Sequence, residues 1–140
     1  MECRAQQVCS VGMATTELTV QNFERTVLDS DIVFVDFWAA WCGPCRQFAP
    51  VFEAASQKHP DIVFGKVDTE AEQALSGALQ ITSIPTIMAF RDGILILAQP
   101  GALPAAAFEE IIGKVRALDM DQVRAQLAAQ REEPATATAD

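Results

Sequence analysis

Two kinds of hydrophobic pattern alternate along this chain. Short apolar runs rich in β-branched and aromatic residues predict strands, and stretches with apolar residues three or four positions apart predict helices. The clearest strand is Ile32–Trp38, which is apolar on both faces and is therefore predicted to lie in the centre of a buried sheet. The other predicted strands are Leu18–Val20, Ile62–Val67, Ile84–Phe90 and Ile94–Ala98.

The predicted helices lie between these strands. A helix that follows Cys42 contains Pro50, which predicts a kink because proline removes a backbone hydrogen bond. The sequence Thr69-Glu70-Ala71-Glu72 has the pattern of a capping box and predicts the start of the next helix. Two further helices are predicted over Asn22–Leu28 and from Pro104 onward.

The order of these elements predicts the fold class. Arg91-Asp92-Gly93 separates the last two strands and predicts a tight antiparallel hairpin, because Gly93 readily adopts a positive φ. Alternating strands and helices that close with a hairpin predict an α/β fold, with a central mixed β-sheet flanked by helices on both faces. The cysteines that follow Trp38 would then lie at the carboxyl end of a central strand.

One domain accounts for most of the chain. Its 140 residues, half of them hydrophobic, suffice for one core and are too few for two comfortable ones. We expect residues 1–13 to be a disordered N-terminal extension and residues 14–118 to form the folded domain. Residues 119–140 are expected to form a C-terminal helical extension, with a disordered tail over 132–140.

The charge of the chain excludes several kinds of partner. A formal net charge of -9 argues against nucleic acid and against anionic membranes, since both would repel the molecule at long range.

No uncharged run approaches the length of a membrane span, and the opening residues lack the apolar core of a secretion signal. We therefore expect a cytoplasmic protein, in which structural disulfides are rare but transient catalytic ones occur.

The candidate chemistry lies in Trp41-Cys42-Gly43-Pro44-Cys45, between the central strand and the next helix. Two thiols three residues apart meet on one helical turn, close enough to form a short-loop disulfide. The unpaired N–H groups of a helix N-terminus favour the anionic form of a thiol that lies there. Cys42 would then attack a disulfide, and Cys45 would resolve the intermediate.

The alternative interpretation of this cysteine pair is one half of a zinc site. Zinc needs four ligands, and the remaining candidates are Cys3, Cys9 and the only histidine, His59. Nothing in the sequence places His59 beside Cys42, so we expect no metal. By default Cys3 and Cys9 are incidental exposed thiols, with a regulatory or metal-binding role as the alternative. His59, which precedes Pro60, is expected to be a solvent-exposed residue at a helix end.

Asp36 interrupts the apolar pattern of the central strand. It shares a face with Phe34 and Trp38, so its carboxyl group should be buried, have a raised pKa and exchange a proton with Cys45. The alternative is an aspartate at a strand end that reaches water. Lys66 interrupts the third strand in the same way, and we hypothesise that it approaches Asp36 across the sheet; a lysine that extends into solvent is the alternative.

Two further residues next to predicted strands are candidates for the site. Pro85 opens a strand-like run, and from the sequence alone an ordinary trans proline is favoured, although a cis bond would also suit a bend there. Trp41 lies beside the thiols and outside the strand, so it is expected to form a surface against which a substrate rests.

Several segments of the chain resemble the thioredoxin family in order and spacing. They are Val35-Asp36-Phe37-Trp38-Ala39, Trp41-Cys42-Gly43-Pro44-Cys45, Val67-Asp68, Ser83-Ile84-Pro85-Thr86, Gly93 and Gly101-Ala102. The resemblance runs roughly from Leu18 to Ala117 and implies the thioredoxin fold and general protein-disulfide reductase activity. The N-terminal opening and the extended carboxyl end depart from the family pattern.

The resemblance also implies roles for single residues. Cys42 would be the nucleophile, Cys45 the resolving cysteine and Asp36 the buried acid–base group. The peptide bond before Pro85 would be cis, which reverses the expectation from the sequence alone. A flat apolar surface for substrate contact would be formed by Trp41, Gly43, Pro44, Ile84 and Gly101.

The implied partners are client proteins that contain disulfides and a flavin-dependent thioredoxin reductase that uses NADPH. The chain itself is expected to need no cofactor and to be a monomer. Gly43-Pro44 between the cysteines is the dipeptide of the reducing members of the family, whereas oxidants and isomerases usually carry a histidine there. Two alternatives remain open: a disulfide oxidase or isomerase on the same fold, and a non-enzymatic binding or assembly subunit that uses the apolar surface around Trp41.

Overall fold

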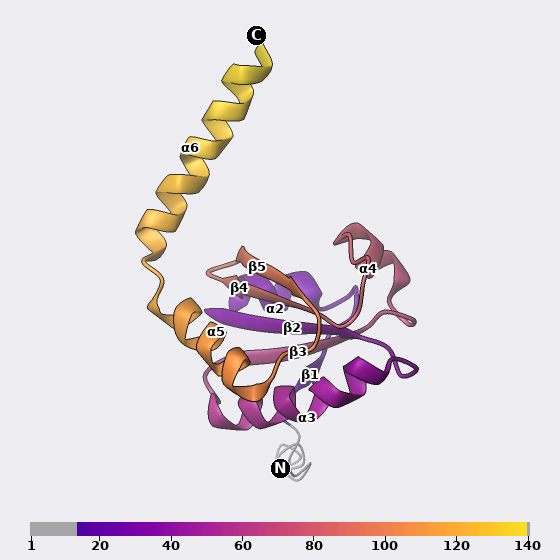
Figure 1. The fold of residues 1–140 in the computed structure, drawn as a ribbon. Coiled ribbons are helices and arrows are strands. Elements are labelled where there is room, and N and C mark those ends of the chain that lie inside the picture. Colours follow the sequence, from indigo (N-terminus) through magenta and orange to yellow (C-terminus); the bar gives the residue numbers. More distant parts are fainter. Residues whose placement is uncertain (1–13, 140) are drawn as a thin grey trace.

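The computed structural model of the chain shows strands and helices in alternating order (Figure 1). It describes the backbone of residues 14–139 and the side chains of residues 14–130. The strands are β1 (Thr16–Glu17), β2 (Ile32–Trp38), β3 (Val63–Asp68), β4 (Thr86–Arg91) and β5 (Ile94–Pro100). The helices are α2 (Phe23–Asp29), α3 (Gly43–Lys58), α4 (Gln73–Ala78), α5 (Ala105–Ala117) and α6 (Met120–Ala139).

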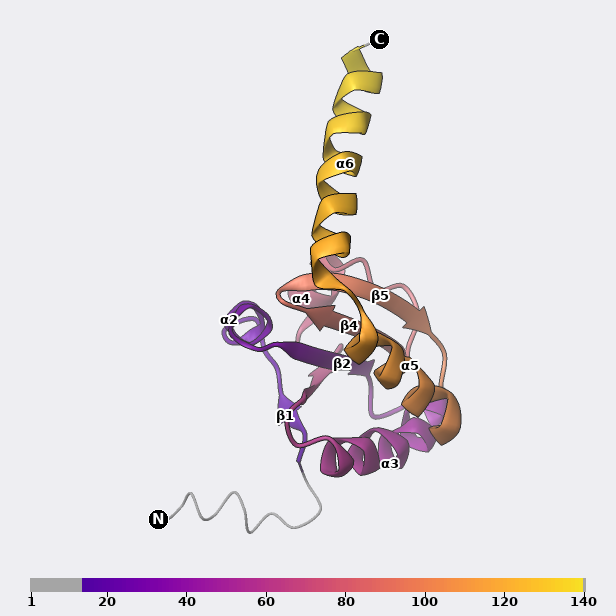
Figure 2. The same cartoon turned by 90° about the vertical axis from the view of Figure 1, so that its left-hand side faces the viewer.

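The strands form one mixed sheet in the order β1-β3-β2-β4-β5. β3 pairs in parallel with both β1 and β2, whereas β4 pairs antiparallel with β2 and with β5. Figures 1 and 2 show α3 and α5 on one side of this sheet and α2 and α4 on the other. The predicted α/β fold, a mixed sheet flanked by helices on both faces, is therefore confirmed.

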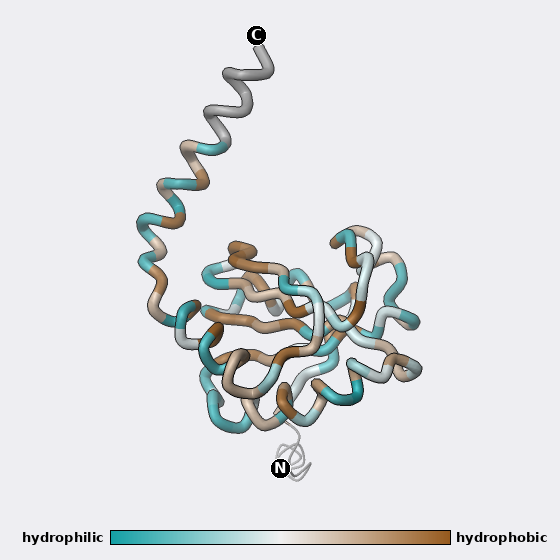
Figure 3. The backbone as a smooth tube through the Cα atoms, in the orientation of Figure 1, coloured by the Kyte–Doolittle hydropathy of each residue, from teal (hydrophilic) through white to brown (hydrophobic). Residues whose placement is uncertain are grey.

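The alternation of side chains along β2 divides the core into two layers. Phe34 faces α3 and α5 and packs against Phe64 and Phe108, with ring centroids 5.8 and 5.5 Å away. Val33 and Val35 belong to the second layer, on the side of α2 and α4. Both faces of β2 are thus covered, which explains why this strand is apolar at every position except Asp36 and is largely brown in Figure 3.

Glycine is required at two positions that shape the sheet. Asp92 and Gly93 have φ angles of 54° and 79° at the tip of the β4–β5 hairpin, which confirms the predicted turn. Gly65 in β3 lies so close to the side chain of Leu18 that a Cβ atom at this position would overlap with it. The absence of a side chain at Gly65 therefore lets Leu18 pack fully buried against the sheet.

The first strand differs from its prediction. It covers Thr16–Glu17 instead of Leu18–Val20. The Thr19 N–H donates to Asn22 Oδ1 (2.7 Å), and the Phe23 N–H donates to the Thr19 carbonyl oxygen (2.9 Å). These two bonds close a turn that leads the chain out of the sheet and into α2, so the apolar residues there do not extend the strand.

The predicted capping box before α4 is also wrong. The helix begins at Gln73, and the preceding Glu72 accepts a hydrogen bond from the Val20 N–H (3.1 Å) instead of capping the helix. The carboxylate that organises this turn belongs to Asp68, whose Oδ1 accepts from the Glu70 N–H at 2.9 Å. A contact with a residue far away in the sequence therefore replaces the local one.

Arg91 joins the end of β4 to the end of α5. Its Nη1 donates to the carbonyl oxygens of Val115, Arg116 and Leu118 at 2.8, 3.0 and 3.0 Å. A cation at this position adds a charged donor at the end of α5, where the Val115 carbonyl oxygen also accepts from the Leu118 N–H (3.4 Å). The following helix, α6, points away from the sheet (Figures 1 and 2), and its backbone is helical also over 132–139, where the composition predicts disorder.

His59 is not the solvent-exposed residue that the sequence predicts. It ends α3, and its side chain is only 19% exposed, because Nε2 lies 2.9 Å from Glu109 Oε1 and Nδ1 lies 3.0 Å from Arg116 Nη2. The same arginine donates two hydrogen bonds to Asp61, which lower the pKa of that carboxyl group to about 2. This polar cluster of His59, Asp61, Glu109 and Arg116 connects the end of α3 to α5.

Candidate active site

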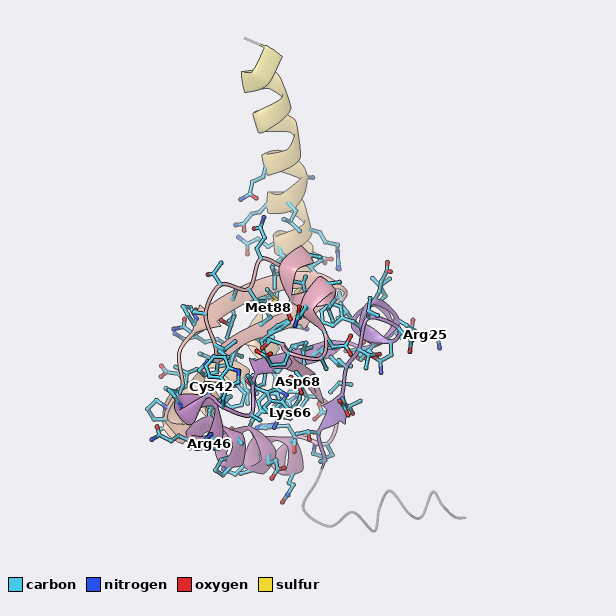
Figure 4. The ribbon with its side chains drawn as sticks, turned by 90° about the vertical axis from the view of Figure 1, so that its right-hand side faces the viewer. Arg25, Cys42, Arg46, Lys66, Asp68 and Met88 are labelled. Carbon is cyan, nitrogen blue, oxygen red and sulfur yellow. A yellow bond between two sulfur atoms is a disulfide. The ribbon has the colours of Figure 1, made fainter. Side chains whose placement is uncertain are left out.

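The cysteine pair lies where β2 passes into α3, and Figure 4 labels Cys42 at the start of that helix. Cys42 is the N-cap residue, and Pro44 lies in the first turn, where its missing N–H costs little. Cys42 and Cys45 form a disulfide with their Cα atoms 5.2 Å apart. The sequence prediction of a redox-active pair at a helix start is thus confirmed.

The N-terminus of α3 faces the sulfur of Cys42. The Cys45 N–H donates to Cys42 Sγ at 3.2 Å, and both cysteines are nearly buried, at 4% and 3% exposure. In the reduced protein, such an N–H group and the positive end of the helix favour the thiolate of Cys42 over its thiol. Since the thiolate is the form that attacks disulfides, this geometry suits a nucleophile.

Asp36 lies within β2, on the face that α3 and α5 cover. It is fully buried, and neither of its carboxyl oxygens has a hydrogen-bond partner among the described residues. Burial raises the pKa of Asp36 from 3.8 to about 7, while the positive charge of Lys66 acts in the opposite direction. A carboxyl group with this pKa exists in both protonation states near neutral pH, which a proton relay requires.

Lys66 is the residue of β3 that pairs in register with Asp36. Its side chain is half-buried, and its Nζ lies 5.0 Å from the centre of the Trp38 ring. The structure therefore places Lys66 beside Asp36 across the sheet, as the sequence hypothesis requires. Its part in proton transfer remains a prediction.

The loop before β4 contributes the opposite wall of the site. The peptide bond between Ile84 and Pro85 is cis, the isomer that the family resemblance implies. Cys42 Sγ lies 3.9 Å from the carbonyl oxygen of Ile84. The Gly101 N–H donates to the carbonyl oxygen of Pro85 at 2.8 Å, so the chain that leaves β5 also lies beside this proline.

A shallow groove of about 360 Å³ extends beside the disulfide from Trp41 to Ile84. The Trp41 side chain is prominent at its rim, because the residue is 67% exposed. Gly43 and Pro44 separate the two cysteines in the first turn of α3. The residues that were predicted to contact a substrate therefore lie around Cys42, and their contact role remains a prediction.

Glu70 is a site residue that the sequence reasoning missed. Its Oε2 accepts a hydrogen bond from the Trp41 indole N–H at 3.1 Å, which holds the exposed ring in one orientation. The two residues are 29 positions apart, and the local pattern around Glu70 indicates a capping box. No local signal in the sequence could therefore have revealed this contact.

Within residues 14–130, no three His, Cys, Asp or Glu side chains are grouped so that they could hold a metal ion. None of the described helices is both long and apolar enough to cross a membrane. Cys3 and Cys9 lie outside the described residues.

The sequence model of the thioredoxin family matches residues 14–114. The chain belongs to the thioredoxin family. It is 55% identical over 118 residues to putative thioredoxin 2 of Streptomyces coelicolor, in a match that covers 84% of this chain and 88% of that protein. Thioredoxin 1 of Synechococcus elongatus is 41% identical over 107 residues, or 75% of this chain and 97% of its own length.

Solved thioredoxin structures have the same fold. A thioredoxin from Plasmodium falciparum superposes with a TM-score of 0.67 at 32% identity and covers 71% of this chain and 98% of that one. A mutant thioredoxin from Halobacterium salinarum gives a TM-score of 0.70 at 28% identity, with 75% and 93% covered. With a disulfide between Cys42 and Cys45, this thioredoxin is a thiol–disulfide oxidoreductase with protein-disulfide reductase activity.

Proposed function

We propose that this chain reduces disulfide bonds of client proteins with Cys42 as nucleophile and Cys45 as resolving cysteine, and that an NADPH-dependent thioredoxin reductase restores its dithiol. The observation that carries this proposal is the contact between the Cys45 N–H and Cys42 Sγ at the start of α3. A sulfur in this position is stabilised as an anion before a client arrives.

The proposed reaction has two exchange steps. In the first, the Cys42 thiolate attacks one sulfur of the client disulfide, so that a mixed disulfide forms and the other client sulfur leaves as a thiolate. In the second, the Cys45 thiolate attacks Cys42 Sγ and releases the remaining client sulfur. The client gains two electrons, the protein loses two, and the product is the disulfide between Cys42 and Cys45.

Asp36 is proposed to accept the proton that Cys45 loses before the second step. Its raised pKa of about 7 supports this role, because a carboxylate with ordinary acidity would be too weak a base for a thiol. Lys66, its register partner, is proposed to moderate that pKa. The test is the pH dependence of mixed-disulfide resolution, which should lose its inflection near neutral pH in Asp36→Asn.

The client is proposed to bind on the apolar surface around Cys42. This contact surface comprises Trp41, Gly43, Pro44, Ile84, Pro85 and Gly101, and the exposure of Trp41 and the adjacent groove support the assignment. Replacement of Trp41 by alanine should raise KM for a protein disulfide more than it lowers kcat, because the ring contributes binding area and not reacting atoms.

The decisive experiment couples the purified protein to NADPH and a thioredoxin reductase and follows the reduction of insulin disulfides. The wild type should turn over, and Cys42→Ser should not. A scaffold that only binds partners would show no turnover in either protein. An oxidase would instead show an equilibrium potential for the cysteine pair well above that of glutathione, which equilibration with glutathione buffers measures directly.

The remaining proposals concern the whole molecule. We expect a cytoplasmic monomer that needs no bound cofactor, with residues 14–118 as the redox domain and 119–140 as a C-terminal extension. The family match over residues 14–114 supports this division. Light scattering of the purified chain tests the monomer, and reduction of insulin by a chain that ends at residue 118 tests the domain boundary.

A further inference from the structure

Three charged residues form a line across three neighbouring strands. Glu17 of β1 pairs in register with Lys66 of β3, and Lys66 pairs in register with Asp36 of β2. Residues paired in this way in a parallel sheet point to the same face. The three side chains therefore follow one another from the edge of the sheet toward its centre.

Exposure falls steadily along this line. Glu17 is exposed, Lys66 is half-buried and Asp36 is fully buried. Glu17 and Lys66 also line one cavity of about 260 Å³, together with Thr15 and Trp38. The Lys66 ammonium group, over the Trp38 ring, thus has an exposed carboxylate on one side and a buried carboxyl group on the other.

We propose that Glu17 is a positioning residue for Asp36 and that it acts through Lys66. The carboxylate of Glu17 attracts the Lys66 ammonium group toward the edge of the sheet and away from Asp36. It also adds a weak negative potential of its own at Asp36. Both effects disfavour the ionised form of Asp36, so Glu17 keeps this group protonated up to a higher pH.

Among the causes of the pKa shift at Asp36, Lys66 is the one charged group, and burial is the other cause. On β3, Asp68 shares the face of Lys66, but its Oδ1 is engaged by the N–H groups of Glu70 and Ala71. On β4 the register partner of Asp36 is the apolar Ile87. On α3 the two cysteines at the start of the helix do not titrate while they are disulfide-bonded. The α5 residues in this core layer, Phe108, Ile112 and Val115, are apolar.

The test measures the titration of Asp36 directly, in the oxidised protein, from the NMR chemical shift of its carboxyl carbon. Neighbouring strands are about 4.8 Å apart, so Glu17 and Asp36 are separated by about 10 Å. In a partly solvated environment we expect Glu17→Gln to lower the midpoint by about half a pH unit and Glu17→Lys by about one unit. Glu24→Gln, which removes an exposed carboxylate from α2, is the matched control and should leave the midpoint unchanged.

The same substitution in a Lys66→Met background tests the route of the effect. There Glu17→Gln should shift the Asp36 midpoint by clearly less, because only the direct field remains. Two outcomes would overturn the proposal: an Asp36 midpoint that does not move in either Glu17 variant, or a shift of equal size with and without Lys66. High salt should reduce the shift, since Glu17 is exposed to solvent.

The importance of Glu17 for catalysis rests on the proposed role of Asp36 as proton relay. The proposal for Glu17 and the proposal for the relay can fail separately. If Asp36→Asn leaves the pH profile of mixed-disulfide resolution unchanged, the relay is wrong, while the titration of Asp36 still decides the proposal for Glu17. If both hold, Glu17→Gln should move the inflection of that profile to lower pH by the same amount as the carboxyl titration.

Discussion

Replacement of Asp36 by asparagine should remove a loss of stability that the oxidised wild-type protein undergoes as the pH rises toward neutrality. The pKa of this buried carboxyl group is raised from 3.8 to about 7, chiefly by desolvation. Below both values the group is protonated in the folded and in the unfolded chain, so it contributes no pH dependence. As the pH rises through this interval, the unfolded chain ionises first, and the native state loses stability until the pH passes the folded pKa. Asparagine does not titrate and escapes this loss.

The size of the effect follows from the two pKa values. They differ by about 3 units, and one unit corresponds to about 1.4 kcal/mol, so the variant should gain about 4 kcal/mol relative to the wild type between about pH 3 and pH 8.5. The asparagine amide is buried without partners as well, which adds a cost that does not vary with pH. Only the change with pH therefore tests the reasoning.

Urea unfolding of both oxidised proteins at a series of pH values gives the difference in their free energies of unfolding as a function of pH. The disulfide form is essential, because its cysteines do not titrate and cannot mask Asp36. Asp61→Asn is a control of opposite sign: a hydrogen bond from Arg116 lowers the pKa of Asp61 to about 2, so this variant should lose stability relative to the wild type as the pH rises above that value. A difference between wild type and Asp36→Asn that changes by less than about 1 kcal/mol across the range would refute the reasoning.

Three further predictions test the thiol chemistry and the core. Cys45→Ser should abolish turnover and trap a client on Cys42 as a mixed disulfide, because no second thiol can release it; non-reducing electrophoresis should show an adduct that a dithiol removes. Phe108→Ala should lower the free energy of unfolding by about 3–5 kcal/mol, because the ring is fully buried against four other phenylalanines, and the redox potential should not change. Arg91→Met should lower the free energy of unfolding by about 1–3 kcal/mol, because three carbonyl oxygens at the end of α5 lose a charged donor. A change in insulin reduction would contradict a purely structural role for Arg91.

The sequence was most informative where local physics decides the structure. The run Ile32–Trp38 has the bounds of β2, because a strand covered on both faces needs apolar residues on both faces, and only Asp36 interrupts this run. Asp92-Gly93 forms the predicted hairpin, because both residues accept a positive φ at low cost. The cysteine pair was found because its spacing and its position before a helix are themselves the chemical signal.

The sequence was least informative where a polar group finds its partner far along the chain. Glu72 looked like part of a capping box, but it accepts from a backbone N–H 52 positions away. His59 looked exposed, but its ring lies between Glu109 and Arg116, about fifty positions further on. Side-chain hydrogen bonds of this kind depend on how helices and strands meet, and periodicity contains no information about that meeting.

The two halves of the site depend on different levels of structure. The reactivity of Cys42 is local, since it follows from the first turn of α3 and the N–H of Cys45. The acidity of Asp36 depends on the whole sheet, since it follows from the layers that bury β2 and from the register that sets Lys66 beside it. Substitutions at the sheet edge or in the core are therefore expected to change the acidity of Asp36 while they leave the first turn of α3 unchanged. The destabilisation that Asp36 causes as the pH rises above 3.8 is the thermodynamic counterpart of this arrangement, because the same burial that weakens the fold makes the carboxylate a stronger base, as the proposed proton transfer requires.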